Sequence, residues 1–532
     1  MIPPVAPPAT PPEPHAWTAG FHGVLMVYAF VTAAIWAGCR TVRKPPIAYA
    51  ASLLLALPVM LITMVLWSFI GPAVGSPTAQ NILGALFTGA LSYAVGCYSS
   101  SEGGTRWMRG TGLARPPNPP SRLATLFRAV FSRTSPARAT KTESLSLASL
   151  PIPPSDETKH FKLIGTTGTG KSTAIRELLT GALRRGDRAV IADPDAGYLS
   201  RFYHPERGDV ILNPFHEGSK RWDLFAEIKA PYDPDELAGA LIAEGHGDER
   251  VWREYARTFL AALLRRAPEA DICTSGALYR ALAVAPRAEL EGLLEGTPAQ
   301  PFVQAGNERM FGSIRSVATS ALAALVYVNN QDAAPFSVRD WIREGRGVLF
   351  LPYKSTEIAA LRTLISTWMR LAIFETLSLA EGDARLWFVV DELDAVGAID
   401  GLKDALTRLR KFGGRCVLGF QSIGQIAALY GRGEADTIIE NCGNTLILRC
   451  SASEGGGTAQ FASRLIGERE IVRTSYSRTR QPDHWFSSQT TSEQQLIESA
   501  VLASEIEQLP DFEGYLRFAS ARPWTRVRLA SP

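Results

Sequence analysis

The sequence predicts an α/β protein with a parallel central sheet, preceded by an apolar helical region and interrupted by an all-helical insertion. Three observations lead to this prediction. After residue 150, short apolar strands alternate with amphipathic helices, which is typical of a parallel sheet. Residues 232–325 break this alternation, because they carry helical patterns only. The first 100 residues contain only four Asp, Glu, Lys or Arg, so this part is set apart by its composition.

Composition and charge exclude several classes of protein. The 532 residues are 46% hydrophobic and 20% charged, which excludes a disordered or collagen-like chain. The six cysteines are scattered without a CxxC pair, so neither a zinc site nor a disulfide framework is expected. Residues 1–142 hold 11 Lys and Arg against 2 Asp and Glu, whereas the remainder holds 44 against 50. The larger part is thus slightly acidic, which argues against a nucleic-acid binder that acts through bulk charge.

Three apolar runs predict membrane helices over about residues 21–40, 47–71 and 80–98, within an anchor of residues 1–110. A run of about 20 residues crosses roughly 30 Å of hydrocarbon. Basic residues lie between the first two runs and again after the third, so we expect the N-terminus outside and the chain beyond residue 100 in the cytoplasm. Two alternatives stay open: one run is a re-entrant segment, which leaves two spans, or the first run is a cleaved signal peptide.

Residues 111–150 are rich in Pro, Ser and Arg and predict a linker. Its cations would lie against anionic lipid of the inner leaflet, where each contributes about 1 kcal/mol. A strap that contacts DNA is the alternative. The linker is followed by the predicted sheet domain, residues 151–231 and 326–532, with residues 232–325 as its all-α insertion.

A glycine-rich loop follows the apolar strand 161–164 and precedes the helix 173–184. It fits the pattern G-x-x-x-x-G-K-[ST], whose backbone N–H groups wrap phosphates at the positive end of a helix. Within it, we expect Lys171 to neutralise the β- and γ-phosphates of ATP and Ser172 to bind Mg²⁺. A glycine-rich turn with a solvated lysine is the alternative. The predicted nucleotide-binding residues are Gly165, Thr166, Thr167, Gly168, Thr169, Gly170, Lys171, Ser172 and Thr173.

A second strand of continuous apolar residues, 386–390, ends in Asp391 and Glu392. A phosphate-binding loop needs an acid at the end of a neighbouring buried strand, and a continuous apolar run is typical of such a strand. We expect Asp391 to hold Mg²⁺ through water, and Glu392 to orient and deprotonate the attacking water. The pair predicts ATP hydrolysis rather than simple nucleotide binding. An acidic turn before the helix 402–410 is the alternative.

Four further candidate residues lie at the ends of other predicted strands and helices. Gln421 comes after the apolar strand 416–420, where an amide can sense the γ-phosphate. Arg410 belongs to a basic cluster that could supply an arginine finger to the nucleotide of an adjacent subunit, although cations at a helix C-terminus are also favoured by its dipole. The strand 189–193 ends in the sequence Asp193-Pro-Asp195, which is either a turn at the strand end or a direct contact to ATP.

A set of motifs follows one another along the chain: GTTGTGKST, ADPDAGYLSRF, ILNPF, WDLFAEI, FSVRDWIREG, VVDEL, RLRKFGGR, LGFQSIGQI and SRLIGE. The phosphate loop alone is shared by hundreds of families, whereas the ordered set is specific. This ordered set resembles the type IV secretion coupling proteins, the TraD/TrwB-like conjugation ATPases. The likeness covers roughly residues 155–525.

The resemblance implies a RecA-like P-loop NTPase domain with an inserted all-α domain, anchored in the bacterial inner membrane. It implies a homo-hexamer around a channel whose ATP hydrolysis is stimulated by DNA, and which links the relaxase-bound plasmid strand to the secretion channel. By matching position, Lys171 and Ser172 take the Walker A roles, Asp391 and Glu392 the Walker B roles, Gln421 that of the sensor and Arg410 that of the finger. Family members usually have two spans and a sizeable periplasmic loop, whereas this chain has three predicted spans and almost no periplasmic segment.

Two other functions stay open. One is a double-stranded DNA translocase of the FtsK/HerA kind, although those with membrane spans usually add a C-terminal winged-helix reader, which is not expected here. The other is a protein-export ATPase or receptor that uses no DNA. A membrane scaffold without hydrolysis is disfavoured by Glu392 beside Asp391. If DNA is the substrate, we expect contacts from a few lumen-facing loops to the backbone of a single strand.

Overall fold

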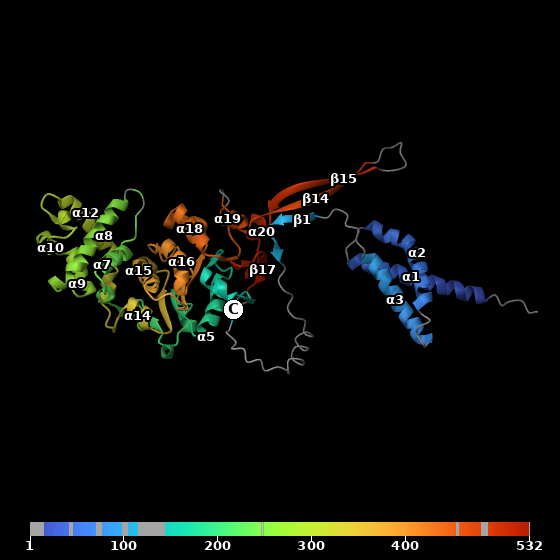
Figure 1. The fold of residues 1–532 in the computed structure, drawn as a ribbon, viewed down its shortest axis with the longest axis horizontal. Helices are drawn as coiled ribbons and strands as arrows, with labels where there is room; N and C mark the ends of the chain where they lie inside the picture. The colour runs from blue at the N-terminus through green and yellow to red at the C-terminus, as the bar shows by residue number, and fades with distance from the viewer. Residues whose placement is uncertain are drawn as a thin grey trace, which may run out of the picture. The chain divides into compact units, whose positions relative to one another are not determined.

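The computed structural model describes residues 15–41, 46–70, 77–97, 105–114, 144–245, 247, 249–382, 384–453, 457–479 and 488–530. The chain divides into two compact units, which are treated separately below (Figure 1). The first comprises residues 1–106 and 472–496, and the second residues 107–471 and 497–532.

The first unit contains the helices α1 (His15–Thr41), α2 (Pro46–Ile70) and α3 (Pro77–Cys97). Residues of α1 and α2 share a small apolar core, while large apolar side chains such as Leu54 and Phe69 are 82% and 81% exposed. Among the described residues, Tyr49–Ile70 is the one helical segment long and apolar enough to cross a membrane, and Val24–Arg40 is a shorter apolar helix. The structure thus contains three helices near the predicted positions, of which one meets the criterion for a span.

A ten-stranded sheet forms the centre of the second unit. Its strand order is β2-β17-β16-β13-β5-β12-β11-β6-β10-β7. The strands from β13 to β7 are parallel, but β16 is antiparallel to both β13 and β17. The prediction of a parallel sheet was therefore incomplete, because the sheet is mixed. The bounds are β2 Leu113–Ala114, β5 Phe161–Ile164, β6 Arg188–Pro194, β7 Val210–Ile211, β10 Val348–Tyr353, β11 Leu386–Val390, β12 Gly414–Phe420, β13 Asn444–Ile447, β16 Glu513–Arg517 and β17 Trp524–Arg528.

Helices cover both faces of this sheet, and the side chains of β11 show why its sequence is apolar throughout. Trp387 and Val389 pack into the core that includes α5 (Lys171–Arg184). Phe388 and Val390 pack into the opposite core, with α15 (Ile358–Leu377) and α16 (Leu402–Leu409). A strand buried on both faces has no polar position to alternate with. Outside residues 233–329, the other α-helices described in this unit are α6 (Leu199–Phe202), α14 (Val338–Glu344), α17 (Ile423–Tyr430), α18 (Arg432–Asn441), α19 (Gly457–Ile466) and α20 (Ala503–Glu507).

The described residues between 233 and 329 form helices without strands, close to the predicted insertion at 232–325. Their apolar side chains belong to the same core as α15, so the insertion is not a separate compact unit. The helices are α7 (Asp233–Leu241), α8 (Glu249–Arg266), α9 (Ser275–Ala283), α10 (Arg287–Leu293), α11 (Gln300–Val303), α12 (Glu308–Leu322) and α13 (Leu325–Asn329).

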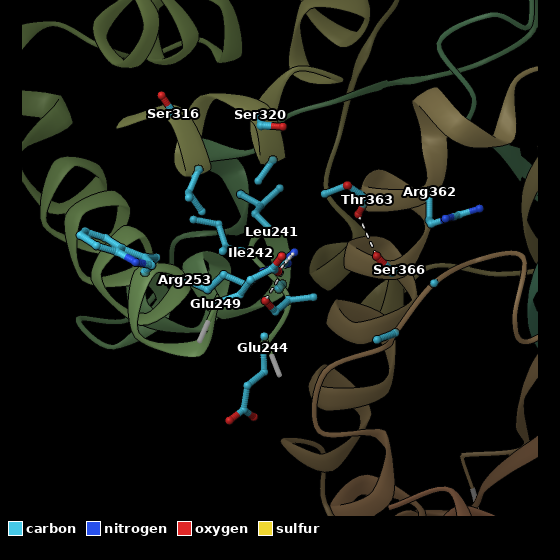
Figure 2. Close-up of a pocket in the computed structure, with 18 of the residues that line it drawn as sticks. Leu241, Ile242, Glu244, Glu249, Arg253, Ser316, Ser320, Arg362, Thr363 and Ser366 are labelled. Carbon is cyan, nitrogen blue, oxygen red and sulfur yellow. Dashed lines mark hydrogen bonds and ion pairs between the residues drawn. The ribbon is translucent and has the colours of Figure 1, made fainter. Parts of the chain in front are cut away.

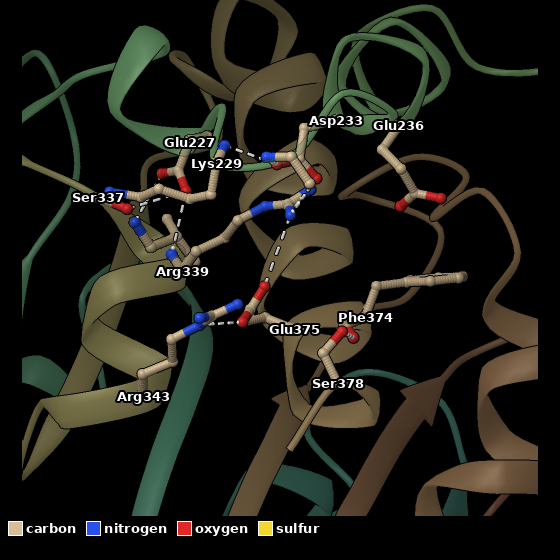
Figure 3. A network of polar contacts seen from close by, with 12 residues as sticks. Glu227, Lys229, Asp233, Glu236, Ser337, Arg339, Arg343, Phe374, Glu375 and Ser378 are labelled. Carbon is tan, nitrogen blue, oxygen red and sulfur yellow. Dashed lines mark hydrogen bonds and ion pairs between the residues drawn. The ribbon is translucent and has the colours of Figure 1, made fainter.

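The root of the insertion is closed by a parallel pair, β8 (Arg221–Trp222) with β9 (Pro335–Phe336), and by a buried polar network (Figure 3). The Glu227 carboxylate is fully buried and accepts hydrogen bonds from the Trp222 side chain at 2.8 Å and from the Val338 backbone at 2.6 Å. The Arg339 guanidinium forms an ion pair with Asp233, 2.6 Å away, at the start of α7. Residues on either side of the insertion are thus joined directly.

The predicted linker, residues 111–150, contains short strands. In addition to β2, this region contains β3 (Ser146–Leu147), which pairs with β4 (Leu150–Pro151). The arginine-rich residues 115–143 lie outside the described residues. A separate three-stranded sheet consists of β1 (Thr105–Gly110), β14 (Glu468–Thr479) and β15 (Ser488–Ser499). Two-residue strands join a sheet through backbone hydrogen bonds, which leave no side-chain pattern for sequence reasoning to detect.

Candidate nucleotide-binding site

The glycine-rich loop lies between β5 and α5, as the motif predicts, and two glycines have the positive φ that its shape requires. Gly168 has φ +78° and Gly170 has φ +114°. A Cβ atom at Gly170 would also come within 2.9 Å of a Leu529 methyl group. A larger residue at Gly170 would therefore be strained by its backbone and by its neighbours.

Neighbouring strands hold this loop in place. Gly165 donates its backbone N–H to Phe420 O at 3.2 Å, and Thr166 donates to Arg449 O at 2.9 Å. On the far side, the Phe512 N–H donates to Thr169 O at 3.0 Å. The loop is thus fixed by the ends of β12 and β13 and by the turn before β16, so little ordering is needed when phosphates bind.

Lys171 begins α5 and is 8% exposed. Its ammonium donates hydrogen bonds to Gly165 O at 2.6 Å and to Thr166 O at 3.2 Å, so the cation is held inside the loop. Burial lowers the pKa of Lys171, and the charges of Asp391 and Glu392 oppose that effect. The site thus places a partly desolvated cation where the loop would bind anionic phosphates.

The loop and the acid pair meet through Ser172. The Ser172 hydroxyl donates to Asp391 Oδ2 at 2.6 Å, although 219 residues separate the two. A hydroxyl and a carboxylate are the hard oxygen ligands that Mg²⁺ takes in nucleotide sites, together with waters and phosphate oxygens. The described residues contain no cluster of three or more His, Cys, Asp or Glu that could hold a metal ion alone. The donor set therefore suits Mg²⁺ that arrives with a nucleotide.

Gln421 connects the loop to Glu392. Its Oε1 atom accepts the Thr167 hydroxyl at 2.9 Å, and its Nε2 atom donates to Glu392 Oε1. This contact is possible because β12 lies between β5 and β11 in the sheet. Burial raises the pKa of Glu392, as do the charges of Asp394 and Asp391, whereas the bond from Gln421 lowers it. A carboxylate whose pKa is raised is a stronger proton acceptor.

Tyr198, at the start of α6 after β6, also reaches the site, and sequence reasoning missed it. The Tyr198 hydroxyl donates to Asp391 Oδ2 at 2.7 Å. Asp193 is fully buried and accepts the backbone N–H groups of Tyr198 and Leu199 at 2.9 and 2.7 Å. Burial raises the pKa of Asp193 to about 6. Asp195 is exposed. The feature of the sequence that could have indicated Tyr198 is an aromatic residue directly after the turn Asp-Pro-Asp-Ala-Gly at a strand end.

Arg410 is not brought to the loop within one chain. It is exposed and begins the 3-10 turn Arg410–Phe412 before β12, whereas Gln421 directly follows that strand. Seven strand residues separate the two ends by roughly 20 Å. Its role as a finger concerns an adjacent subunit and stays a prediction. Thr173 lies in the first turn of α5 and is half-buried.

A cavity of about 1100 Å³ lies apart from these groups, between the insertion and α15 (Figure 2). Ser316 and Ser320 of α12 line one wall, and Arg362, Thr363 and Ser366 of α15 line another. None of the residues of the nucleotide site lines it.

Comparison with known proteins identifies the family. Residues 144–530 match the family model of the type IV secretion-system coupling protein DNA-binding domain. The coupling protein TraD of Escherichia coli (strain K12) is 30% identical over 400 residues, which are 73% of this chain and 55% of TraD. The chain thus spans about half the length of that relative.

Solved structures of the conjugative coupling protein TrwB agree with this family. An unbound form, TrwBdeltaN70, is 32% identical with a TM-score of 0.68, and the match covers 80% of this chain and 94% of that one. A complex of TrwB with ADP and Mg²⁺ is 31% identical with a TM-score of 0.67 over the same shares. Together with a phosphate loop and an acid pair that meet in space, these matches show that the chain belongs to the type IV secretion-system coupling protein family.

Proposed function

We propose that this protein is an ATPase that couples relaxase-bound DNA to a type IV secretion channel and drives DNA transfer in conjugation. The observation that carries the proposal is the family match over residues 144–530, which contains both the phosphate loop and the acid pair. The solved TrwB complex with ADP and Mg²⁺ supports ATP and Mg²⁺ as its ligands.

The side chains at the site suggest a separate role for each residue in ATP hydrolysis. The loop N–H groups and Lys171 bind the phosphates, while Ser172 and Asp391 hold the metal. Mg²⁺, when bound, neutralises charge that develops on the phosphate oxygens. Glu392 accepts a proton from the attacking water at its carboxylate. Gln421 is hydrogen-bonded to both Glu392 and Thr167, so it fixes the position of the carboxylate relative to the loop.

DNA dependence and assembly are part of the proposal. The name of the matched domain supports DNA as a substrate. We propose a homo-hexamer in which Arg410 of one subunit reaches the nucleotide of the next, and the exposure of Arg410 is compatible with such a contact. Relaxase proteins and components of the secretion channel are the proposed partners.

We also propose a position in the bacterial inner membrane, with three spans, the N-terminus outside and the ATPase in the cytoplasm. The segment Tyr49–Ile70 supports one span. The lengths of α1 and α3, 27 and 21 residues, support two more, because each is roughly 30 Å or longer. The basic residues after α3 support the orientation.

The test is the ATPase rate of the full chain in detergent, with and without single-stranded DNA, at several salt concentrations. We expect stimulation by DNA that weakens as salt rises. Lys171→Ala should abolish turnover and still reach the membrane fraction, and Glu392→Gln should lower turnover by about 100-fold or more while ATP binding persists. Unchanged turnover of Lys171→Ala would overturn the ATPase assignment. Turnover without any response to DNA would favour an export ATPase that acts on proteins.

A further inference from the structure

The turn after β6 has an unusual backbone conformation. Asp195 and Ala196 have φ values of +53° and +54°, in the left-handed region that residues with a side chain rarely adopt. Two such residues in succession make this turn a strained stretch of backbone. Gly197 and Tyr198 follow directly, so the strained turn reverses the chain and returns Tyr198 towards the sheet edge.

Several contacts hold this turn in its shape. Both oxygens of the buried Asp193 carboxylate accept N–H groups from the start of α6, one of them that of Tyr198 itself. The Asp195 N–H donates to Tyr353 O on β10 at 2.7 Å. On the other side, the Arg176 guanidinium of α5 lies 5.7 Å from the centre of the Tyr198 ring. The tyrosine is thereby 1% exposed and fixed from both sides.

The Tyr198 hydroxyl donates a hydrogen bond to Asp391, the first acid of the pair. Tyr198 and Ser172 both donate to Oδ2 of Asp391, at 2.7 and 2.6 Å. The paired registers of β11 and β6 end at Val390 and Ala192, which makes Asp391 and Asp193 the next residues on adjacent strands. Two hydroxyl donors on one oxygen fix the rotation of the carboxylate. The other oxygen, Oδ1, would then accept a hydrogen bond from a water bound to the metal.

We propose that Tyr198 is a positioning residue that holds Asp391 in the orientation required for Mg²⁺ binding with the nucleotide. This inference rests on the proposed function. It explains why the chain retains a strained turn after β6, since the strain places a hydroxyl donor beside the metal-binding carboxylate. A tyrosine that only filled space in the core would need neither the donor nor the turn.

The experiment measures the affinity for ADP in the full chain in detergent, once with Mg²⁺ and once with EDTA. The ratio of the two dissociation constants reports the contribution of the metal without any hydrolysis. In Tyr198→Phe, which keeps the ring and removes the hydroxyl, we expect the Mg²⁺ contribution to fall about tenfold, because one hydrogen bond to a charged group is lost. The affinity in EDTA should stay within twofold of the unchanged protein.

Tyr203→Phe is the matched control, because Tyr203 lies five residues away and is 37% exposed. It should leave both affinities unchanged. A second measurement uses the electron paramagnetic resonance of Mn²⁺ with ADP, which should show weaker Mn²⁺ binding in Tyr198→Phe and unchanged binding in Tyr203→Phe. Thermal unfolding without nucleotide verifies that each variant is folded. Asp193→Asn weakens the hydrogen bond that holds the Tyr198 backbone, so it should also lower the contribution of Mg²⁺ to ADP affinity.

The outcomes separate the inference from the proposed function. If the unchanged protein binds ADP equally with Mg²⁺ and with EDTA, the proposed nucleotide site itself is wrong. If it needs Mg²⁺ and Tyr198→Phe behaves identically, the positioning role is wrong while the site stands. Equal weakening with Mg²⁺ and with EDTA would also contradict the positioning role, because it would indicate general damage to the pocket.

Discussion

Thr167 and Gln421 are hydrogen-bonded to each other at 2.9 Å, although they belong to different elements and lie 254 residues apart. Thr167 belongs to the phosphate loop, and Gln421 follows β12 and also bonds Glu392. The proposed proton acceptor is therefore connected to the loop by a single amide. A change in the loop on nucleotide binding can be transmitted to Glu392 through this side chain.

Gln421→Ala should uncouple hydrolysis from binding. Without the amide, Glu392 keeps its charge but loses its position, so we expect kcat to fall about 10- to 100-fold. The dissociation constant for ADP should stay within about threefold, because Gln421 is not part of the loop. Steady-state ATPase assays and ADP titrations measure the two quantities. Gln425→Ala, on the exposed side of α17, is the control, and equal losses in both variants would contradict this role.

Asp193 should make the stability of the nucleotide-free protein depend on pH. Its folded pKa of about 6 lies above the ordinary value of 3.8, so the folded state binds the proton more tightly. Its contribution is then fully present below about pH 4 and is lost as pH rises through 6, by up to about 3 kcal/mol. In Asp193→Asn, the decline in unfolding free energy between pH 4 and pH 7 should be smaller. Denaturant unfolding measures this, with the exposed Asp195→Asn as the comparison.

Arg339→Met should destabilise the protein through the root of the insertion (Figure 3). The substitution leaves Asp233, which is 1% exposed, without its cation, and breaking a buried ion pair costs about 3–5 kcal/mol. Lys229→Met breaks an ion pair with Asp340 whose partners are 42% and 53% exposed, so it should cost less than about 1 kcal/mol. Chemical denaturation of both variants compares these costs. Similar values for the two would show that the root network does not hold the insertion.

Arg410→Ala should be rescued by mixing if the arginine acts between subunits. Alone, Arg410→Ala and Lys171→Ala should each lose most ATP turnover. In mixed assemblies, an intact loop on an Arg410→Ala subunit meets an intact arginine from a Lys171→Ala neighbour. Turnover should therefore rise above that of either variant alone, as measured over a series of mixing ratios. Absence of any rise would argue that Arg410 does not act across an interface.

The sequence was most informative where one motif controls local geometry. The strand, loop and helix around Lys171 were predicted with their order, because glycines and a lysine at that spacing permit few conformations. The acid pair was located because a strand buried on both faces reads as a continuous apolar run. Its contact with Ser172 could be predicted only from the chemistry, since no local rule brings together residues 219 positions apart.

Other features left weaker traces in the sequence. The antiparallel strands β16 and β17 were not predicted. The direction in which a strand joins a sheet depends on which sheet edge is available to it, and not on the types of its residues. Tyr198 was missed because its function comes from a turn with positive φ at Asp195 and Ala196, residues that ordinarily avoid that region. Gln421 was placed correctly after its strand, but its two partners became visible only with the strand order.

The hydrogen bonds from Phe512 to Thr169, and from Leu529 to the Phe512 carbonyl, have a consequence for biosynthesis. The phosphate loop leaves the ribosome roughly 360 residues before Leu529 does. Until then, the loop lacks the hydrogen bond that Thr169 accepts from Phe512. The contacts of the loop to Phe420 and Arg449 can form earlier in synthesis, so the support from Phe512 is the last of these three to become available.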